Sequence, residues 1–143
     1  MRGLATYLLA AMLLCLSCKG GKVQQAEVSS PTDLRTVRID ATSVEQGASD
    51  SLQVGRLRSG EIIAKTIRIE NHSGKPLVLT HHQVSCGCLS AAYERKPIAD
   101  GGYADVRMEF DSRTMYGLQL KSLNLYFAEK DKPLKIFIEA EVE

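Results

Sequence analysis

The sequence predicts an all-β fold, an immunoglobulin-like antiparallel β-sandwich of about seven strands that follows a signal peptide and a flexible tether. Apolar and polar residues alternate with a period of two along most of the chain after residue 36, which is typical of strands with one buried face. Turn-forming residues interrupt this alternation at nearly regular intervals, and no convincing helical stretch lies among them. Short, evenly spaced strands of this kind favour two packed sheets.

Length and charge place the chain among ordinary single domains. It has 143 residues, of which 44% are hydrophobic, enough for one domain with a real core. Lys and Arg total 18 and Asp and Glu total 17, and Arg2 is the only charge within residues 1–17, so the rest of the chain is neutral. Nucleic-acid binding needs clustered cations, and we therefore expect no nucleic-acid partner.

Residues 1–17 have the three parts of a bacterial signal peptide: Arg2, an apolar run, and the small residue Ser17. The apolar run of about thirteen residues is too short to span a bilayer. The segment that ends at Ser17-Cys18 resembles a lipobox, in which a small residue precedes a cysteine that receives acyl chains. We predict cleavage before Cys18 and its acylation, for example with palmitate. The alternative is an ordinary secretory signal that leaves Cys18 as a free thiol.

Residues 18–36 are polar and lack apolar periodicity, which predicts a flexible tether. Acyl chains on Cys18 would hold the protein on a membrane, because each buried methylene contributes about 0.8 kcal/mol. The expected organisation is a signal peptide (1–17), a tether (18–36) and a sandwich domain (37–143). We expect a lipid-anchored protein of the bacterial cell envelope that faces the periplasm.

The clearest strand lies between Tyr103 and Phe110, where Val106 and Met108 share the buried face and Arg107 points outward. Residues 134–142 repeat the pattern. Weaker strands are expected at residues 37–41, 52–56, 62–71, 77–84 and 118–127. No helix is expected beyond the signal peptide, because the one segment open to a helical interpretation, residues 91–95, is too short to be stable alone.

Several short motifs between Leu52 and Val142 resemble the bacterial family called domain of unknown function 1573. The motifs are Gly60-Glu61, Ile67-Arg68-Ile69-Glu70-Asn71, Gly74-Lys75-Pro76-Leu77, Ser85-Cys86-Gly87-Cys88, Pro97-Ile98 and Phe110-Asp111-Ser112. The cysteine motif is the most specific of these. The resemblance implies an immunoglobulin-like sandwich, often carried on lipoproteins, with no assigned activity. Leu89, Asp100 and His82 depart from the family pattern.

Cys86 and Cys88 are the cysteines expected in the folded domain, and their spacing leaves three interpretations open. They could form a disulfide or a redox-active pair, provided that Gly87 lets the backbone tighten. As thiolates they could bind copper or zinc together with His82. They could also be small buried residues where a strand turns between sheets. His81 and His82 are adjacent and point to opposite faces of a strand, so at most one of them could join such a site.

The sequence contains no nucleophile elbow and no glycine-rich loop that leads into a helix, so we expect no catalytic residues and no enzyme. It predicts a membrane-anchored, non-enzymatic interaction module with an envelope protein or glycan as its partner. The alternative is an envelope thiol-redox or soft-metal protein that uses Cys86 and Cys88.

Overall fold

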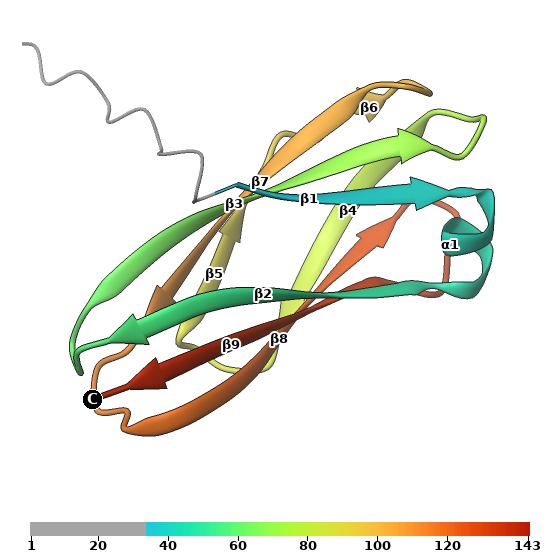
Figure 1. Cartoon of the computed structure of the whole chain (residues 1–143). Coiled ribbons are helices and arrows are strands. Elements are labelled where there is room, and N and C mark those ends of the chain that lie inside the picture. The colour runs from blue at the N-terminus through green and yellow to red at the C-terminus, as the bar shows by residue number, and fades with distance from the viewer. Residues whose placement is uncertain (1–33) are drawn as a thin grey trace, which may run out of the picture.

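The computed structural model describes residues 34–143, which form two β-sheets packed face to face (Figure 1). Nine strands and one short helix follow in this order: β1 (Leu34–Asp40), α1 (Ala41–Gln46), β2 (Ala48–Leu57), β3 (Ile62–His72), β4 (Leu77–Val84), β5 (Leu89–Ala92), β6 (Pro97–Ile98), β7 (Tyr103–Asp111), β8 (Gly117–Phe127) and β9 (Leu134–Val142). The predicted all-β sandwich is confirmed. The first strand begins at Leu34, three residues before the predicted start of the domain.

One sheet has the strand order β1-β3-β7-β5 and the other has the order β2-β9-β8-β4-β6. Hydrogen-bonded neighbours within the sheets run antiparallel except at two edges, where β1 lies parallel to β3 and β2 lies parallel to β9. The prediction of antiparallel sheets therefore missed the two edge pairs. β1 lies at the edge of one sheet and β2 at the edge of the other, so the chain changes sheets through α1 between them.

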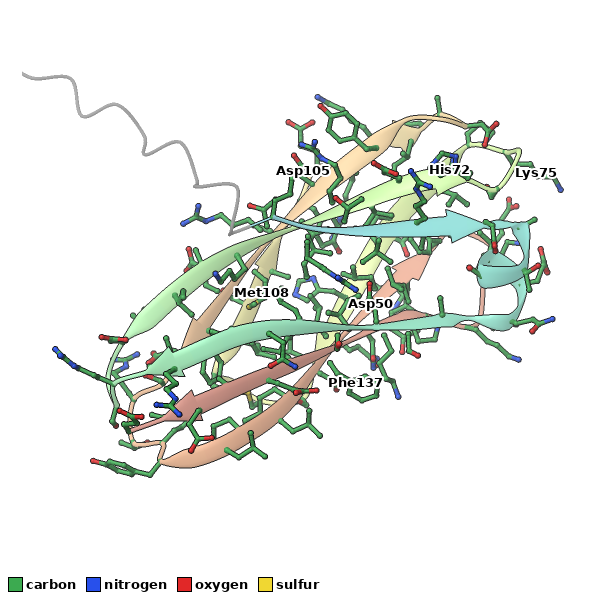
Figure 2. All side chains as sticks on the ribbon, in the orientation of Figure 1. Asp50, His72, Lys75, Asp105, Met108 and Phe137 are labelled. Carbon is green, nitrogen blue, oxygen red and sulfur yellow. A yellow bond between two sulfur atoms is a disulfide. The ribbon has the colours of Figure 1, made fainter. Side chains whose placement is uncertain are left out.

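The core lies between the two sheets and follows the alternation seen in the sequence. Val106, Met108 and Phe110 of β7 are fully buried, as are Leu134, Ile136 and Ile138 of β9. Figure 2 shows Met108 between the sheets and Phe137 on the outside of the molecule. Period-two patterning thus predicted the buried face of both strands, because side chains alternate strictly between the two faces of a sheet.

Helix α1 contradicts the expectation that no helix follows the signal peptide. Asp40 caps it, since its side chain accepts a hydrogen bond from the backbone N–H of Ser43 at 2.7 Å. Val44 is its buried residue and joins the core. Six residues with one buried side chain show no helical periodicity, and the helix exists because tertiary packing holds it.

Two short strands, β5 and β6, were not predicted. The chain leaves β4 at Val84, pairs as β5 with the end of β7, and then joins the other sheet as β6 beside Leu77 and Val78. The segment from Val84 to Ile98 therefore crosses between the sheets twice. No helix within residues 34–143 has the length and apolar character needed to cross a membrane.

Candidate functional site

The first crossing brings the two predicted cysteines together. Cys86 and Cys88 form a disulfide with their Cα atoms 5.1 Å apart, in the loop that leads from β4 to β5. Both residues are half-buried and pack against the core, while Gly87 between them is exposed. A Cβ atom added at Gly87 would meet nothing within 4 Å, so the loop is open to solvent on that side.

The crossing is also fixed by the main chain. Ser85 donates its backbone N–H to the carbonyl oxygen of Ser122 on β8 at 3.0 Å, and Asp111 on β7 donates to the carbonyl oxygen of Cys88 at 2.9 Å. Leu89 closes the loop with a 3.3 Å bond to the carbonyl oxygen of Cys86. A disulfide across one intervening residue restricts the unfolded chain little, by about 1.5 kcal/mol, against about 3 kcal/mol for a 15-residue loop. The crossing therefore depends only weakly on its disulfide.

A small pocket of about 170 Å³ opens beside the disulfide and is lined by Cys88, Gly87, Ile62 and the carboxylates of Glu109 and Asp111 among others. Ile62 is 62% exposed, although it lies next to this pocket. The Arg113 side chain, with its backbone N–H, donates hydrogen bonds to Asp111 and holds the pKa of that carboxyl below its usual range. Asp111 is thus a paired carboxylate at the rim.

The two adjacent histidines lie on opposite sides of β4. His81 is exposed and stacks on Tyr126 with ring centroids 4.4 Å apart. His82 is half-buried, and its Nδ1 lies 3.4 Å from the hydroxyl oxygen of Tyr93. Within residues 34–143 no three His, Cys, Asp or Glu side chains form a group that could hold a metal. A copper or zinc site at Cys86, Cys88 and His82 would first require reduction of the disulfide, because thiolates are the metal ligands.

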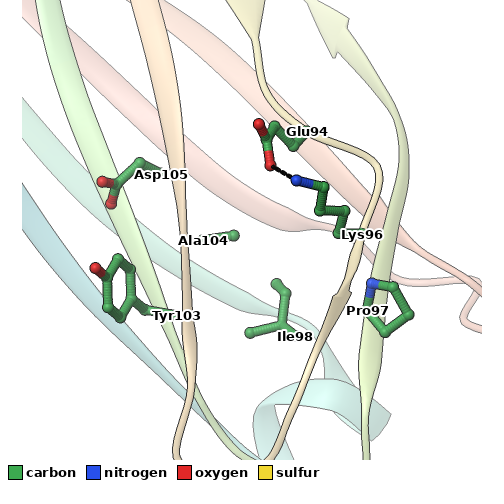
Figure 3. A pocket seen from close by; sticks show the side chains of 7 residues that line it. All are labelled: Glu94, Lys96, Pro97, Ile98, Tyr103, Ala104 and Asp105. Atoms are coloured by element: carbon green, nitrogen blue, oxygen red, sulfur yellow. Dashed lines mark ion pairs between the residues drawn. The ribbon is translucent and has the colours of Figure 1, made fainter.

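The second crossing creates a groove of about 480 Å³ that the sequence did not reveal. It is lined by Tyr103, Ala104 and Asp105 of β7, Pro97 and Ile98 of β6, and Glu94 and Lys96 of the segment before β6. Figure 3 shows Ile98 and Ala104 pointing toward the space between the two strands, whereas Tyr103 and Asp105 lie on the other side of β7. Glu94 and Lys96 form an exposed ion pair of 2.7 Å at its rim.

The β7 backbone beside this groove has an open edge. The N–H of Asp111 points toward the β5 side of the strand, where it meets Cys88. β7 pairs with β3 from Tyr103 to Asp111 without a register shift. Along such a strand, every second residue directs its backbone N–H and C=O to the same side. The backbone groups of Tyr103 and Asp105 therefore point to the β5 side of β7, as those of Asp111 do. β5 pairs with β7 only as far as Arg107. In the part of the chain that the structure describes, no strand covers the rest of this edge.

Charged and aromatic side chains stiffen the open edge from the outer face. Arg68 of β3 donates two hydrogen bonds to Asp105, of 2.8 and 2.9 Å, and its guanidinium carbon lies 4.0 Å from the centre of the Tyr103 ring. The hydrogen bond from Arg68 to Asp105 raises the pKa of the guanidinium. These contacts fix the side chains of Tyr103 and Asp105 on the side of β7 opposite to that of Ala104.

Asn71 and Ser112, which belong to the short motifs shared with the family, stabilise the fold. Asn71 is completely buried and donates to the carbonyl oxygens of Lys75 and Ile98, while its own oxygen accepts from Ser73. Ser112 is also completely buried, and its hydroxyl lies 2.8 Å from the carbonyl oxygen of Glu61. These contacts explain the Asn71 and Ser112 motifs by folding alone. In the Ser-Cys-Gly-Cys motif the Ser85 hydroxyl likewise accepts a hydrogen bond from the backbone N–H of Ser122 at 2.9 Å, whereas the main-chain bonds that hold the loop do not involve the two sulfur atoms.

The structure thus brings Cys86 and Cys88 together and places His82 beside Tyr93. The predicted acylation site, Cys18, lies outside the described residues. Sequence reasoning missed the groove because its two walls are 5 to 11 residues apart along the chain but belong to different sheets. A two-residue strand such as β6 gives no period-two signal that could have revealed this arrangement.

Comparisons with solved structures show the fold. A protein of unknown function from Porphyromonas gingivalis W83 has 24% identity and a TM-score of 0.57, over 65% of this chain and 44% of that chain. This chain therefore spans less than half of that protein. The family 123 glycoside hydrolase from Clostridium perfringens has 9% identity and a TM-score of 0.55, over 79% and 26% of the two chains. The VesB protease of Vibrio cholerae has 16% identity and a TM-score of 0.52, over 65% and 30%. Identities this low carry no activity across.

No curated protein matches the sequence. The model of one family does match, over residues 46–142, and its description reads protein of unknown function (DUF1573). The match begins in α1 and ends with the last residue of β9, so it takes in both crossings and the disulfide loop. This chain belongs to the DUF1573 family.

Proposed function

We propose that this protein is a non-enzymatic interaction module of the bacterial cell envelope, anchored to a membrane through acylated Cys18, that binds an extended segment of another envelope protein. The observation that carries the proposal is the groove along the open edge of β7. An unpaired strand edge accepts an extended peptide as an additional strand, because its free N–H and C=O groups need partners.

The groove offers both parts of such a binding site. Backbone groups of Tyr103 and Asp105 point into the open edge, and the apolar side chains of Ala104 and Ile98 line the space beside it. An added strand would direct alternate side chains toward half-buried Ala104 and the others into solvent, whereas Ile98, at 3% exposure, belongs to the core behind the groove wall. The bound segment is therefore expected to alternate apolar and polar residues over about four positions, the length of the uncovered edge.

Four surface carboxyl groups serve as ion-pair partners or as a helix cap. The resolved pKa shifts of the carboxyl groups of Asp40, Glu45, Glu70 and Asp111 are all downward, and a hydrogen-bond donor is the main cause of each. A general acid that works near neutral pH needs a raised pKa. These four carboxylates are tuned to stay ionised, as expected for ion pairs and caps on a binding domain.

Photo-crosslinking in intact cells tests the proposal. A photoreactive residue replaces Lys96 at the groove rim of the full-length protein, and a control carries it at Glu141, an exposed position on β9 that does not line the groove. We expect one recurring envelope protein to be captured from position 96 and not from position 141. Capture of glycan or lipid alone, or equal capture from both positions, would contradict the proposal.

A matched pair of variants tests the strand edge itself. Tyr103→Pro removes the backbone N–H that points into the groove, at the first residue of a strand, where proline is tolerated. Tyr103→Ala removes the same ring and keeps the N–H. We expect the proline variant to lower crosslinking from position 96 about tenfold relative to the alanine variant, the effect of losing one backbone hydrogen bond worth about 1.4 kcal/mol. Equal crosslinking by the two variants would exclude binding through the edge.

A further inference from the structure

The Cys86–Cys88 disulfide lies at the opposite end of β7 from the groove and has no part in the proposed peptide binding. Cys88 lies beside Asp111, the last residue of β7, whereas the groove contains Tyr103, the first. The function proposed above therefore leaves the most specific motif of the sequence without a task.

Three features distinguish this disulfide from one that holds a fold together. It links residues only two positions apart. The loop that it closes is already bonded to β8 through Ser85 and to β7 through Cys88. The disulfide is also within reach of solvent, since Cys88 lines a pocket together with exposed Gly87. Accessible disulfides in small rings are the ones that exchange with external thiols.

We propose that Cys86 and Cys88 form a reversible dithiol–disulfide site that exchanges two electrons with a protein dithiol of the cell envelope. A thiolate of that dithiol attacks Sγ of Cys88, which lines the pocket, and forms a mixed disulfide. The bond between Cys88 and Cys86 breaks, and the Cys86 thiolate takes up a proton. The second thiolate of the partner then attacks the partner's first sulfur in the mixed disulfide. The partner's own disulfide forms, and Cys88 leaves as a thiolate that takes up a proton.

The balance of this exchange is complete. The protein gains two electrons and two protons and holds two thiols, and the partner dithiol becomes a disulfide. The fold accommodates both states, because the main-chain bonds of Ser85, Leu89 and Asp111 do not involve the sulfur atoms. The exposed side chain of Ile62 at the pocket gives the partner an apolar contact beside the sulfur that it attacks.

A redox titration of the full-length protein, purified from membranes in detergent, tests the proposal. The protein is equilibrated in glutathione buffers of increasing reduced fraction, its thiols are alkylated, and its mass and circular dichroism are measured. We expect a single transition in which two alkyl groups are added together, the β-sheet spectrum stays unchanged, and excess oxidised glutathione reverses the mass. A disulfide that stays oxidised in reduced glutathione until the domain unfolds, or thiols that fail to close again, would overturn the proposal.

Two single variants test which sulfur is attacked. Cys86→Ala leaves Cys88 as the thiol that lines the pocket, and Cys88→Ala leaves Cys86. Each purified variant is incubated briefly with oxidised glutathione, whose disulfide the remaining thiolate attacks with release of reduced glutathione. Because the exchange is reversible, the sulfur that is attacked in the forward direction is the one that attacks a disulfide in the reverse direction, and we expect Cys86→Ala to form its mixed disulfide with glutathione several-fold more than Cys88→Ala does. Equal or reversed yields would contradict the assignment of Cys88. The crosslink from position 96 is a separate readout, so this proposal can fail while the groove proposal holds.

Discussion

The side-chain nitrogen Nδ2 of Asn71 lies 2.8 Å from the carbonyl oxygen of Ile98, 27 residues further along the chain. The same nitrogen donates to the carbonyl oxygen of Lys75 at 2.7 Å, and the side-chain oxygen accepts from the backbone N–H of Ser73 at 3.0 Å. Asn71 thereby ties the end of β3 to the turn before β4 and to β6, one wall of the groove. A buried amide with every donor and acceptor satisfied specifies one arrangement of these segments.

Asn71→Asp is expected to disrupt this junction, because a carboxylate would face two carbonyl oxygens where the amide donates. We expect the free energy of unfolding to fall by at least about 2 kcal/mol, measured by urea denaturation. The control Ser73→Ala removes only the hydroxyl that bonds Asn71 at 2.7 Å and should cost about 1 kcal/mol. An Asn71→Asp variant as stable as Ser73→Ala would contradict the role given to Asn71.

Gly47, between α1 and β2, has a φ of 80° and a ψ of 163°, a backbone conformation that essentially only glycine adopts. A Cβ atom there would also lie 3.3 Å from the carbonyl oxygen of Pro133 and 3.2 Å from Cβ of Lys132. Gly47→Ala should therefore lower the free energy of unfolding by about 1–3 kcal/mol. Gly60→Ala, also at a positive φ but with no atom within 4 Å of the added Cβ, is the control and should cost less. Thermal denaturation of both variants gives the comparison.

Met108 on β7 has no exposed surface and lies in the middle of the sandwich. Met108→Ala would leave a cavity that the surrounding strands cannot fill, and we expect a loss of about 2–5 kcal/mol in the free energy of unfolding. Met108→Leu keeps nearly the same volume and should cost less than about 1.5 kcal/mol. Urea denaturation curves of similar slope would show that only stability has changed. Similar losses in the two variants would contradict dense packing at this position.

Glu70 on β3 contributes stability that depends on pH. Hydrogen bonding from Arg38, and then from His72, holds the pKa of its carboxyl below the ordinary value. Because the pKa is lower in the folded state, the contribution is present above the unfolded pKa and disappears as pH falls through the folded pKa. Glu70→Gln should therefore be less stable than the parent protein at pH 7. The two proteins should be nearly equal in stability at a pH below the pKa of Glu70 in the folded protein.

The midpoint of urea denaturation, measured at low salt from pH 7 down to this acid pH, gives the difference in stability between the parent protein and Glu70→Gln. At 1 M salt the difference at pH 7 should shrink, because ions screen exposed pairs. A difference that grows as the pH falls would have the wrong sign for a carboxyl group whose pKa is lowered on folding.

The sequence by itself determined which face is buried on the strands where apolar and polar residues alternate clearly. Period-two alternation identified Val106 and Met108 as core residues, since neighbouring side chains on a strand must point to opposite faces. It also singled out Cys86 and Cys88, and the short motifs around them carried the correct family resemblance. The interior strands β3, β4, β7, β8 and β9 were predicted almost to their ends.

Only the tertiary structure decided which strands are neighbours. Alternation tells which face is buried but not which strand lies alongside, so the parallel edges β1 and β2 and the two crossings of residues 84–98 were not predictable. The helix α1 escaped notice because a single buried side chain, Val44, makes no periodic pattern. The groove and the open disulfide loop exist because β5 covers only part of β7 before the chain changes sheets, and that depends on long-range packing around the common core.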